Sequence, residues 1–106
     1  MINPQLKKGL LDVSVLSVLN RKESYGYKIL KDTKDIIDMS ESTLYPILKR
    51  LQNSGCVTSH SIEHNGRLRK MYRITPKGTE QIRLFLESWD EIEKIHDYIK
   101  EGLQYD

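Results

Sequence analysis

The side chains best suited to chemistry in this 106-residue sequence lie in residues 42–53, STLYPILKRLQN. Four apolar residues at helical spacing predict the buried face of an amphipathic helix: Leu44, Ile47, Leu48 and Leu51. The opposite face is small-polar, aromatic and cationic: Ser42, Thr43, Tyr45, Pro46, Lys49, Arg50 and Asn53. Such a face suits the major groove of DNA, because small residues allow close approach while hydroxyl, lysine and arginine groups contact bases or phosphates.

Pro46 constrains where this helix begins. The sequence predicts a helix over residues 42–54, capped by Ser42 or Thr43. Pro46 then lies in the first turn, where a proline costs little because the first backbone N–H groups have no acceptor within the helix. A helix that began at Ser40 would instead have a kinked first turn.

A basic hairpin is predicted directly after this helix. Residues 56–75, CVTSHSIEHNGRLRKMYRIT, form two alternating runs around Asn65-Gly66, a dipeptide that favours a type I′ turn. The tip and second strand are cationic at Arg67, Arg69, Lys70 and Arg73. Two interpretations stay open: the cations protect strand edges from aggregation, or they form a wing that contacts phosphates. Their position next to the cationic helix favours the wing.

Two further helices are predicted before residue 42. Residues 5–20 are apolar on more than one side, which indicates burial on most sides and, in so small a protein, cover from a second chain. Ser24 is the predicted cap of a second helix over residues 25–34. Its inward residues are expected to be Tyr25, Ile29 and Leu30. Gly26 in its first turn costs about 1 kcal/mol relative to alanine, which a close backbone approach to a neighbouring helix would explain.

The last predicted helix is long and carries one apolar seam. Thr75 is its expected cap and Pro76 its first residue. Seven residues then follow a 3-4 spacing: Ile82, Phe85, Trp89, Ile92, His96, Ile99 and Leu103. A helix of about 26 residues spans roughly 40 Å, more than this small domain can cover. The seam therefore needs a partner, either the first helix of the same chain or, as we favour, a second copy.

Charge is unevenly distributed along the chain. Residues 1–78 hold 14 Lys and Arg against 7 Asp and Glu, whereas residues 79–106 hold 3 against 8, within a net charge of +2. A basic body beside an acidic last helix indicates that the two parts face different partners, with nucleic acid as a candidate for the first. The alternative is a solvated charge pattern that has no partner.

Other functional classes find little support. The sequence shows no nucleophile–base pair, glycine-rich phosphate loop or paired carboxylates, so we predict neither an enzyme nor a cofactor. Cys56 and the three histidines lack the close spacing of a metal site. Cys56 is interpreted as a small buried filler rather than a redox sensor, and it suits a reducing cytoplasm. The apolar runs are too short to span a membrane.

The order helix, helix, cationic helix and basic hairpin predicts a mostly α (α+β) winged helix-turn-helix. The sequence resembles the PadR family of transcriptional regulators, in the short subgroup that has a single C-terminal helix. The resemblance rests on SYGYKIL (24–30), STLYPILKRLQNSG (42–55) and KMYRITPKG (70–78). The chain departs from the family pattern at Ser42, where glycine is frequent, and at Cys56-Val57, where Gly-Leu or Gly-Tyr is usual.

The resemblance implies a homodimeric repressor that binds an inverted-repeat operator. Residues 1–75 would form the DNA-binding domain and residues 76–106 the dimerisation helix. The residues carried over as DNA contacts are Tyr25, Lys28, Ser42, Thr43, Tyr45, Lys49, Arg67 and Arg69, and the face of residues 42–53 and the hairpin add Arg50, Asn53 and Lys70. The expected dimer interface comprises Leu10, Val13, Ile82, Phe85, Trp89, Ile92, His96 and Ile99.

Some relatives hold aromatic effectors between their dimerisation helices, which implies Phe85, Trp89 and Ile92 as candidate effector contacts here. Two plainer interpretations remain open: Trp89 as a packed interface residue, and His96 as a satisfied polar contact rather than a pH-sensitive one. The alternative function is a winged helix that binds protein instead of DNA. A steep loss of affinity with salt would favour DNA, because each neutralised phosphate releases counterions.

Overall fold

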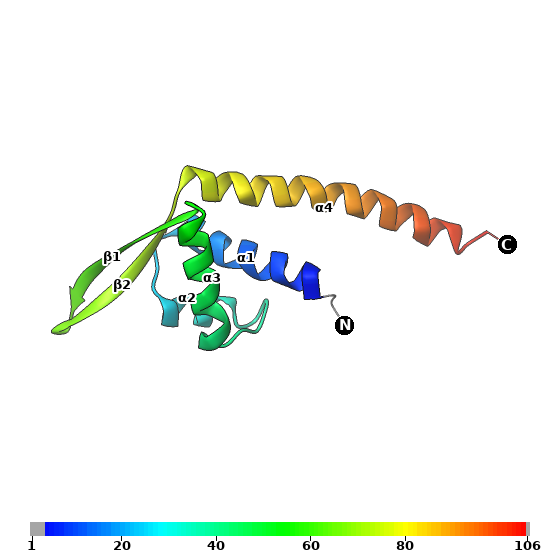
Figure 1. The fold of residues 1–106 in the computed structure, drawn as a ribbon. Coiled ribbons are helices and arrows are strands. Elements are labelled where there is room, and N and C mark those ends of the chain that lie inside the picture. Colours follow the sequence, from blue (N-terminus) through cyan, green and yellow to red (C-terminus); the bar gives the residue numbers. More distant parts are fainter. Residues whose placement is uncertain (1–3, 106) are drawn as a thin grey trace.

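The computed structural model describes residues 4–105. Their elements, in chain order, are α1 (Pro4–Arg21), α2 (Gly26–Thr33), α3 (Glu41–Asn53), β1 (Val57–His64), β2 (Arg67–Ile74) and α4 (Pro76–Gly102). The first three helices form a cluster under the start of α4, while the β1–β2 hairpin and the far half of α4 extend in opposite directions (Figure 1). The molecule is correspondingly elongated, with extents of 68 × 26 × 20 Å. The predicted mostly α winged helix-turn-helix is confirmed.

The core is built where α1, α2 and α3 meet the base of the hairpin. Its most deeply buried side chains are aliphatic: Val15, Leu16, Ile29, Leu44, Leu48 and Val57. The predicted inner face of α3 is therefore correct, since Ile47 and Leu51 are buried as well. Burial of this apolar surface is the main force that holds α3 against α1 and α2.

The start of α2 differs from the prediction. Ser24 does not cap the helix; Tyr25 occupies the N-cap position. The backbone of Ser24 instead forms an antiparallel bridge with Tyr72 of β2. The nitrogen of Ser24 lies 3.1 Å from the carbonyl oxygen of Tyr72, and the nitrogen of Tyr72 lies 2.7 Å from the carbonyl oxygen of Ser24. The bridge extends the hairpin by one short pairing. It leaves the buried Ser24 hydroxyl without a hydrogen-bond partner among residues 4–105.

The start of α3 also differs. Ser40 is the N-cap residue, so neither Ser42 nor Thr43 caps the helix, and Pro46 is the sixth helical residue rather than part of the first turn. Pro46 has no N–H for the carbonyl of Ser42, one turn earlier. Ser42 and Pro46 are both exposed, so water can hydrogen-bond to that carbonyl. Exposure explains how the helix accommodates the proline.

The hairpin turn and the start of α4 agree with the sequence. Asn65 and Gly66 have φ values of +52° and +77°, as a type I′ turn requires, and the strands pair in register from His64 opposite Arg67 to Val57 opposite Ile74. Thr75 caps the 27-residue α4 by accepting a hydrogen bond from the Gly78 N–H at 3.2 Å. Pro76 follows as the first helical residue.

No helix within residues 4–105 has the length and apolar character needed to cross a membrane.

Leu48 tests how strongly the core anchors α3. Leu48 is 1% exposed, so Leu48→Ala should lower the free energy of unfolding by about 2–5 kcal/mol through lost burial and an unfilled cavity. Leu68→Ala, which removes the same atoms from a side chain that is 80% exposed at the hairpin, should change it little. Urea denaturation at a fixed protein concentration measures both, and equal effects would contradict this core.

Candidate nucleic-acid interface

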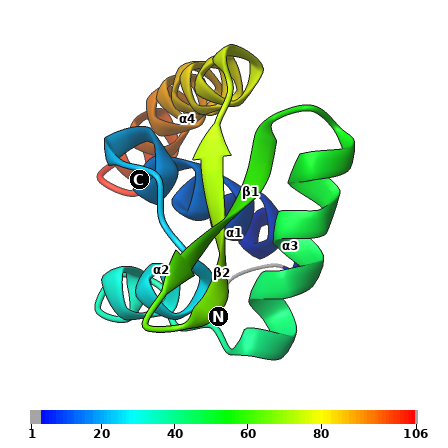
Figure 2. The same ribbon diagram turned by 90° about the vertical axis from the view of Figure 1, so that its left-hand side faces the viewer.

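The outer face of α3 is open to solvent. The exposed side chains on it are Ser42, Tyr45, Pro46, Lys49 and Asn53. Thr43 is half-buried, and its hydroxyl lies 3.3 Å from that of Ser40, which is also 2.8 Å from the Ser42 hydroxyl. Figure 2 shows α3 at the edge of the molecule, with one side against α1 and the other free. The helix thus presents a row of donors and acceptors next to one free ammonium group.

Arg50 is placed differently from the other cations of α3. It is half-buried, and its guanidinium forms an ion pair and hydrogen bond with the carboxylate of Asp12 on α1. This contact joins α3 to α1 and neutralises an acid that would otherwise lie beside the outer face. Arg50 therefore anchors α3 in this structure, and its guanidinium is not free in the way that the Lys49 ammonium is.

The wing brings a second set of cations to the same end of the molecule. Arg69 of β2 lies over the ring of Tyr25, with its guanidinium carbon 3.9 Å from the ring centroid. Lys70 lies 5.6 Å from the ring centroid of Tyr72, and Arg67 is exposed beside the turn. A cation held over an aromatic face gains electrostatic attraction while its other face stays available. Tyr25, predicted to point inward, is half-buried and supports Arg69.

Glu23 ties the wing to the α1–α2 connection. Its carboxylate accepts hydrogen bonds from Arg73 Nη2 at 2.7 Å and Nε at 3.1 Å, and His60 Nε2 of β1 lies 3.9 Å away. The hydrogen bond from Arg73, with help from its charge, holds the pKa of the Glu23 carboxyl below its usual value against an opposing effect of burial. Together with the Ser24–Tyr72 bridge, this contact fixes the base of the wing.

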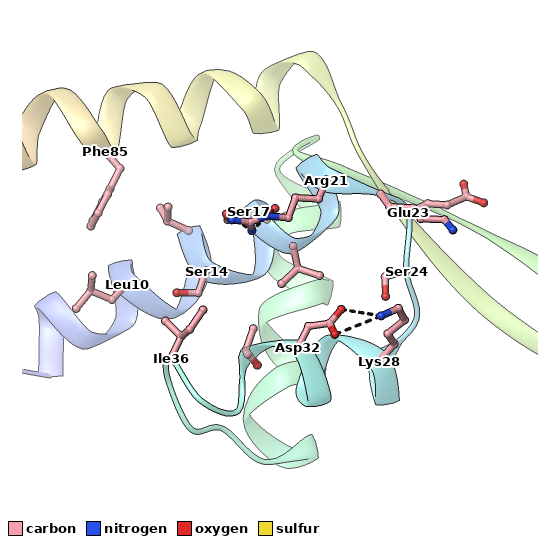
Figure 3. A pocket seen from close by; sticks show the side chains of 14 residues that line it. Leu10, Ser14, Ser17, Arg21, Glu23, Ser24, Lys28, Asp32, Ile36 and Phe85 are labelled. Atoms are coloured by element: carbon pink, nitrogen blue, oxygen red, sulfur yellow. Dashed lines mark hydrogen bonds and ion pairs between the residues drawn. The ribbon is translucent and has the colours of Figure 1, made fainter.

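Lys28 does not join these groups. Its ammonium pairs with Asp32 at 3.1 Å, and both side chains line a groove of about 610 Å³ between α1, α2 and Phe85 of α4 (Figure 3). Lys28 lies two residues after Gly26, which places it roughly 200° around the helix from the side that meets α3. The structure therefore brings Tyr25, Arg69 and the face of α3 together but separates Lys28 from them.

The residues predicted for a dimer interface form a strip along α1 and α4. Leu10 and Val13 are half-buried in the groove of Figure 3, as is Phe85, and Ile82 packs against the core. Further along α4, Trp89 is 38% and Ile99 63% exposed, and Ile92 and His96 are exposed as well. Apart from His96, the strip is apolar. Its α4 residues follow one another at intervals of three and four residues, and this chain covers them only in part.

Two of the three candidate effector contacts form an aromatic pair. The rings of Phe85 and Trp89 are stacked, with centroids 6.2 Å apart and an interplanar angle of 21°. Phe85 lines the 610 Å³ groove, whereas Trp89 and Ile92 lie beyond it on the exposed part of α4. The three residues therefore share a helix face without sharing one cavity of this chain.

Sequence reasoning missed the long-range ion pairs that hold the interface. Asp12 and Arg50 are 38 residues apart, and Glu23 and Arg73 are 50 apart. Pairs at such separations leave no local pattern in one sequence. Gly26, by contrast, had a visible signal, because a glycine in the first turn of a helix needs an explanation.

The order of helices, the cationic third helix and the wing define a winged helix-turn-helix protein. Residues 15–84 match the family model described as "Transcriptional regulator PadR-like family". The chain therefore belongs to the PadR-like family of transcriptional regulators.

Solved structures agree with this assignment. A transcriptional regulator from Clostridium thermocellum is 30% identical, with a TM-score of 0.81 over 92% of this chain and 97% of that one. A protein from Streptococcus mutans UA159 is 36% identical, with a TM-score of 0.78 over 90% of each chain. PadR from Bacillus subtilis, solved in complex with operator DNA, is 27% identical, with a TM-score of 0.68 over 73% of this chain and 46% of that one.

The Glu23–Arg73 contact predicts a pH-dependent effect on stability. Since the folded-state pKa of Glu23 is lowered, the contact stabilises the fold above the usual glutamate pKa, and the stabilisation is lost as the pH falls through the folded-state value. Arg73→Gln should therefore be less stable than wild type at neutral pH, and the difference should shrink below about pH 4.5. Urea denaturation from about pH 7 to about pH 3 measures it. Arg67→Gln, which removes a cation from the far end of the same strand at the wing tip, should show no such dependence.

Proposed function

We propose that this protein is a cytoplasmic, homodimeric repressor of transcription that binds an inverted-repeat operator in double-stranded DNA. One observation carries the proposal: α3 is anchored through Leu44, Ile47, Leu48 and Leu51 while its polar, cationic side is free. A helix held in this way can enter a major groove as a rigid unit. The operator complex of the Bacillus subtilis PadR, whose fold this chain shares, supports the same use of the fold.

The proposed DNA contacts fall into two groups. Ser42, Thr43, Tyr45, Lys49 and Asn53 enter the major groove, where hydroxyl, amide and ammonium groups meet base edges and phosphates. Tyr25, Arg67, Arg69 and Lys70 follow the backbone or the adjacent minor groove. Lys28 and Arg50 are paired with Asp32 and Asp12, so their positive charges are already balanced by carboxylates in this chain, although each keeps further N–H donors. We therefore assign these two a smaller part in binding.

The exposed strip on α1 and α4 is the proposed surface for a second copy of the chain. Beyond Phe85, the apolar residues of α4 lie outside the core of this chain, and Ile92 is still 48% exposed. The 3-4 spacing of these residues is that of a helix seam that packs on another helix. Residues 76–106 thus act as the dimerisation part and residues 1–75 as the DNA-binding part. A dimer would place two α3 helices on one duplex.

The stacked pair Phe85 and Trp89 supports a proposed second role for this strip. A small aromatic effector could stack on the exposed part of Trp89 beside Ile92, because offset aromatic rings attract one another beyond their apolar contact. Binding there would change how the α4 helices pack and so alter the spacing of the two α3 helices. Such a change would release the operator.

The proposed function is tested by selecting DNA from a random-sequence library with the purified protein. We expect an inverted repeat whose half-sites are about one helical turn, roughly 34 Å, apart. Binding should weaken steeply with salt, because phosphate contacts release counterions. Failure to enrich any sequence, together with no salt-dependent retention on heparin, would reject DNA binding and leave a protein-binding winged helix.

Lys49 provides a test of the major-groove assignment. Lys49→Ala should weaken binding to the selected operator by about tenfold, the loss of one specific contact. Lys94→Ala removes an equal charge from an exposed position on α4 and should leave affinity nearly unchanged. Fluorescence anisotropy at one salt concentration compares the variants. Equal effects of the two substitutions would show that Lys49 contributes only general positive charge.

Trp89 provides a test of the dimer surface. Trp89→Ala should shift the monomer–dimer equilibrium toward monomer, because tryptophan is enriched among the interface residues whose truncation costs about 2 kcal/mol or more. Tyr98→Ala removes an aromatic ring that is 77% exposed on another side of α4 and should leave the equilibrium unchanged. Sedimentation velocity across a dilution series measures both. If the monomer–dimer equilibrium of Trp89→Ala equalled that of the wild type, Trp89 would contribute only to packing within one chain.

A further inference from the structure

Gly26 lies directly beneath Tyr45, at the contact between the start of α2 and the outer edge of α3. Gly26 is the first residue of α2 and is buried. A Cβ atom built on it would collide with the Tyr45 hydroxyl and lie 3.0 Å from Cζ and 3.3 Å from Cε1 of the same ring. The sequence predicts that the backbone of a neighbouring helix approaches Gly26 closely. In the structure it is the Tyr45 side chain that does so. The tyrosine ring fills the space that any other residue at position 26 would need.

Backbone conformation does not explain this glycine. The glycines with positive φ are Gly55 and Gly66 among residues 4–105, and Gly26 is not one of them. Alanine would therefore suit the backbone of α2 better, since it has the higher helix propensity. What glycine provides at this position is room for Tyr45.

The position of Tyr45 depends on this room. Its neighbour Leu44 is fully buried, and Leu48, one turn further on, is 1% exposed, so the backbone of α3 is fixed by the core. The Tyr45 side chain is 46% exposed, with one edge of its ring against α2 and the rest open to solvent. Contact with Gly26 therefore decides where the phenol hydroxyl lies on the outer face of α3.

We propose that Gly26 is a positioning residue for operator recognition: it lets one edge of the Tyr45 phenol, the hydroxyl included, lie against the start of α2, in the orientation in which it contacts DNA. The proposal rests on the function proposed above. A methyl group at position 26 would meet only the far end of a side chain, which can swing outward while the core residues keep α3 in place. The chain would still fold, but its tyrosine would be displaced into the space that the duplex occupies.

Gly78 shows what a structurally required glycine looks like in the same chain. A Cβ atom there would collide with the backbone carbonyl of Cys56 and press on Ile74. Backbone cannot swing away as a phenol can, so substitution of Gly78 would disturb the junction of α3, the hairpin and α4. The expected effect of Gly26→Ala is different, because it should lower the affinity for DNA rather than the stability of the fold.

A double-mutant cycle tests the proposal with the duplex that the wild-type protein selects from a random library. Gly26→Ala should weaken binding by about tenfold, the size of a displaced specific contact. The same substitution should have almost no effect when Tyr45 is already alanine, because no ring remains to be displaced. In a Tyr45→Phe background its effect should be intermediate, since the colliding hydroxyl is gone and the Cζ contact remains. Gly102→Ala, whose added Cβ meets nothing within 4 Å, is the matched control and should bind like wild type.

Thermal unfolding of the same variants tests the contact without DNA. In the Tyr45→Ala background, Gly26→Ala should raise the melting temperature by a few degrees, because alanine lowers the conformational entropy of the unfolded chain at a position whose backbone it can adopt. In the wild-type background the rise should be absent, because the displaced ring offsets it. Equal effects of Gly26→Ala in both backgrounds, on binding and on melting, would overturn the proposal. If the wild-type protein selects no DNA, the proposed function fails, and the melting cycle alone decides whether Gly26 positions Tyr45.

Discussion

The structure depends on how α3 is held. Four aliphatic side chains on one side of this helix are buried against α1, α2 and the base of the hairpin, and the other side stays mostly exposed to solvent. The helix is short and contains a proline, so its own hydrogen bonds contribute little to keeping it in place. Apolar burial and the ion pair between Arg50 and Asp12 do this instead. Because the anchor is on one side only, the residues of the free side can be chosen for recognition without loss of the fold.

The beginning of α2 contacts both of the elements proposed to bind DNA, α3 and the wing. Tyr25 supports Arg69 of the wing through its ring, and Gly26 makes room for Tyr45 of α3. Just before them, Glu23 and Ser24 hold β2: the Glu23 carboxylate pairs with the guanidinium of Arg73, and the Ser24 backbone forms a bridge with that of Tyr72. Four successive residues therefore contact both α3 and the wing, in addition to the direct hydrogen bond from Gln52 of α3 to Ser59 of β1. This arrangement explains why a short helix with a glycine in its first turn lies at the centre of the interface.

The long helix α4 divides into two parts with different surroundings. Its first turns pack on α1 and are joined to the end of α3, since Lys77 donates a hydrogen bond to the carbonyl of Ser54 at 2.6 Å and Thr75 donates one to that of Gly55 at 2.6 Å. Its later turns carry the same apolar spacing without cover from the chain. In the proposed mechanism, this junction is where a change in the packing of the later turns reaches α3. This continuity gives the proposed dimer surface a mechanical connection to the proposed DNA surface.

Most of the helices and strands, and the buried faces of the helices, were predictable from the sequence. Periodicity placed the buried leucines of α3, Asn65-Gly66 fixed the hairpin turn, and Thr75-Pro76 marked the start of α4, because each of these signals acts over a few neighbouring residues. The predicted helix starts were less accurate: Ser24 and Ser42 are good caps in principle, yet Ser24 pairs with Tyr72 and the N-cap residue of α3 is Ser40. Three features became visible only in the folded chain: Arg50 is held by Asp12, Lys28 points away from α3, and Tyr45 lies over Gly26. These contacts join residues far apart in the chain, and their geometry follows from how the helices pack.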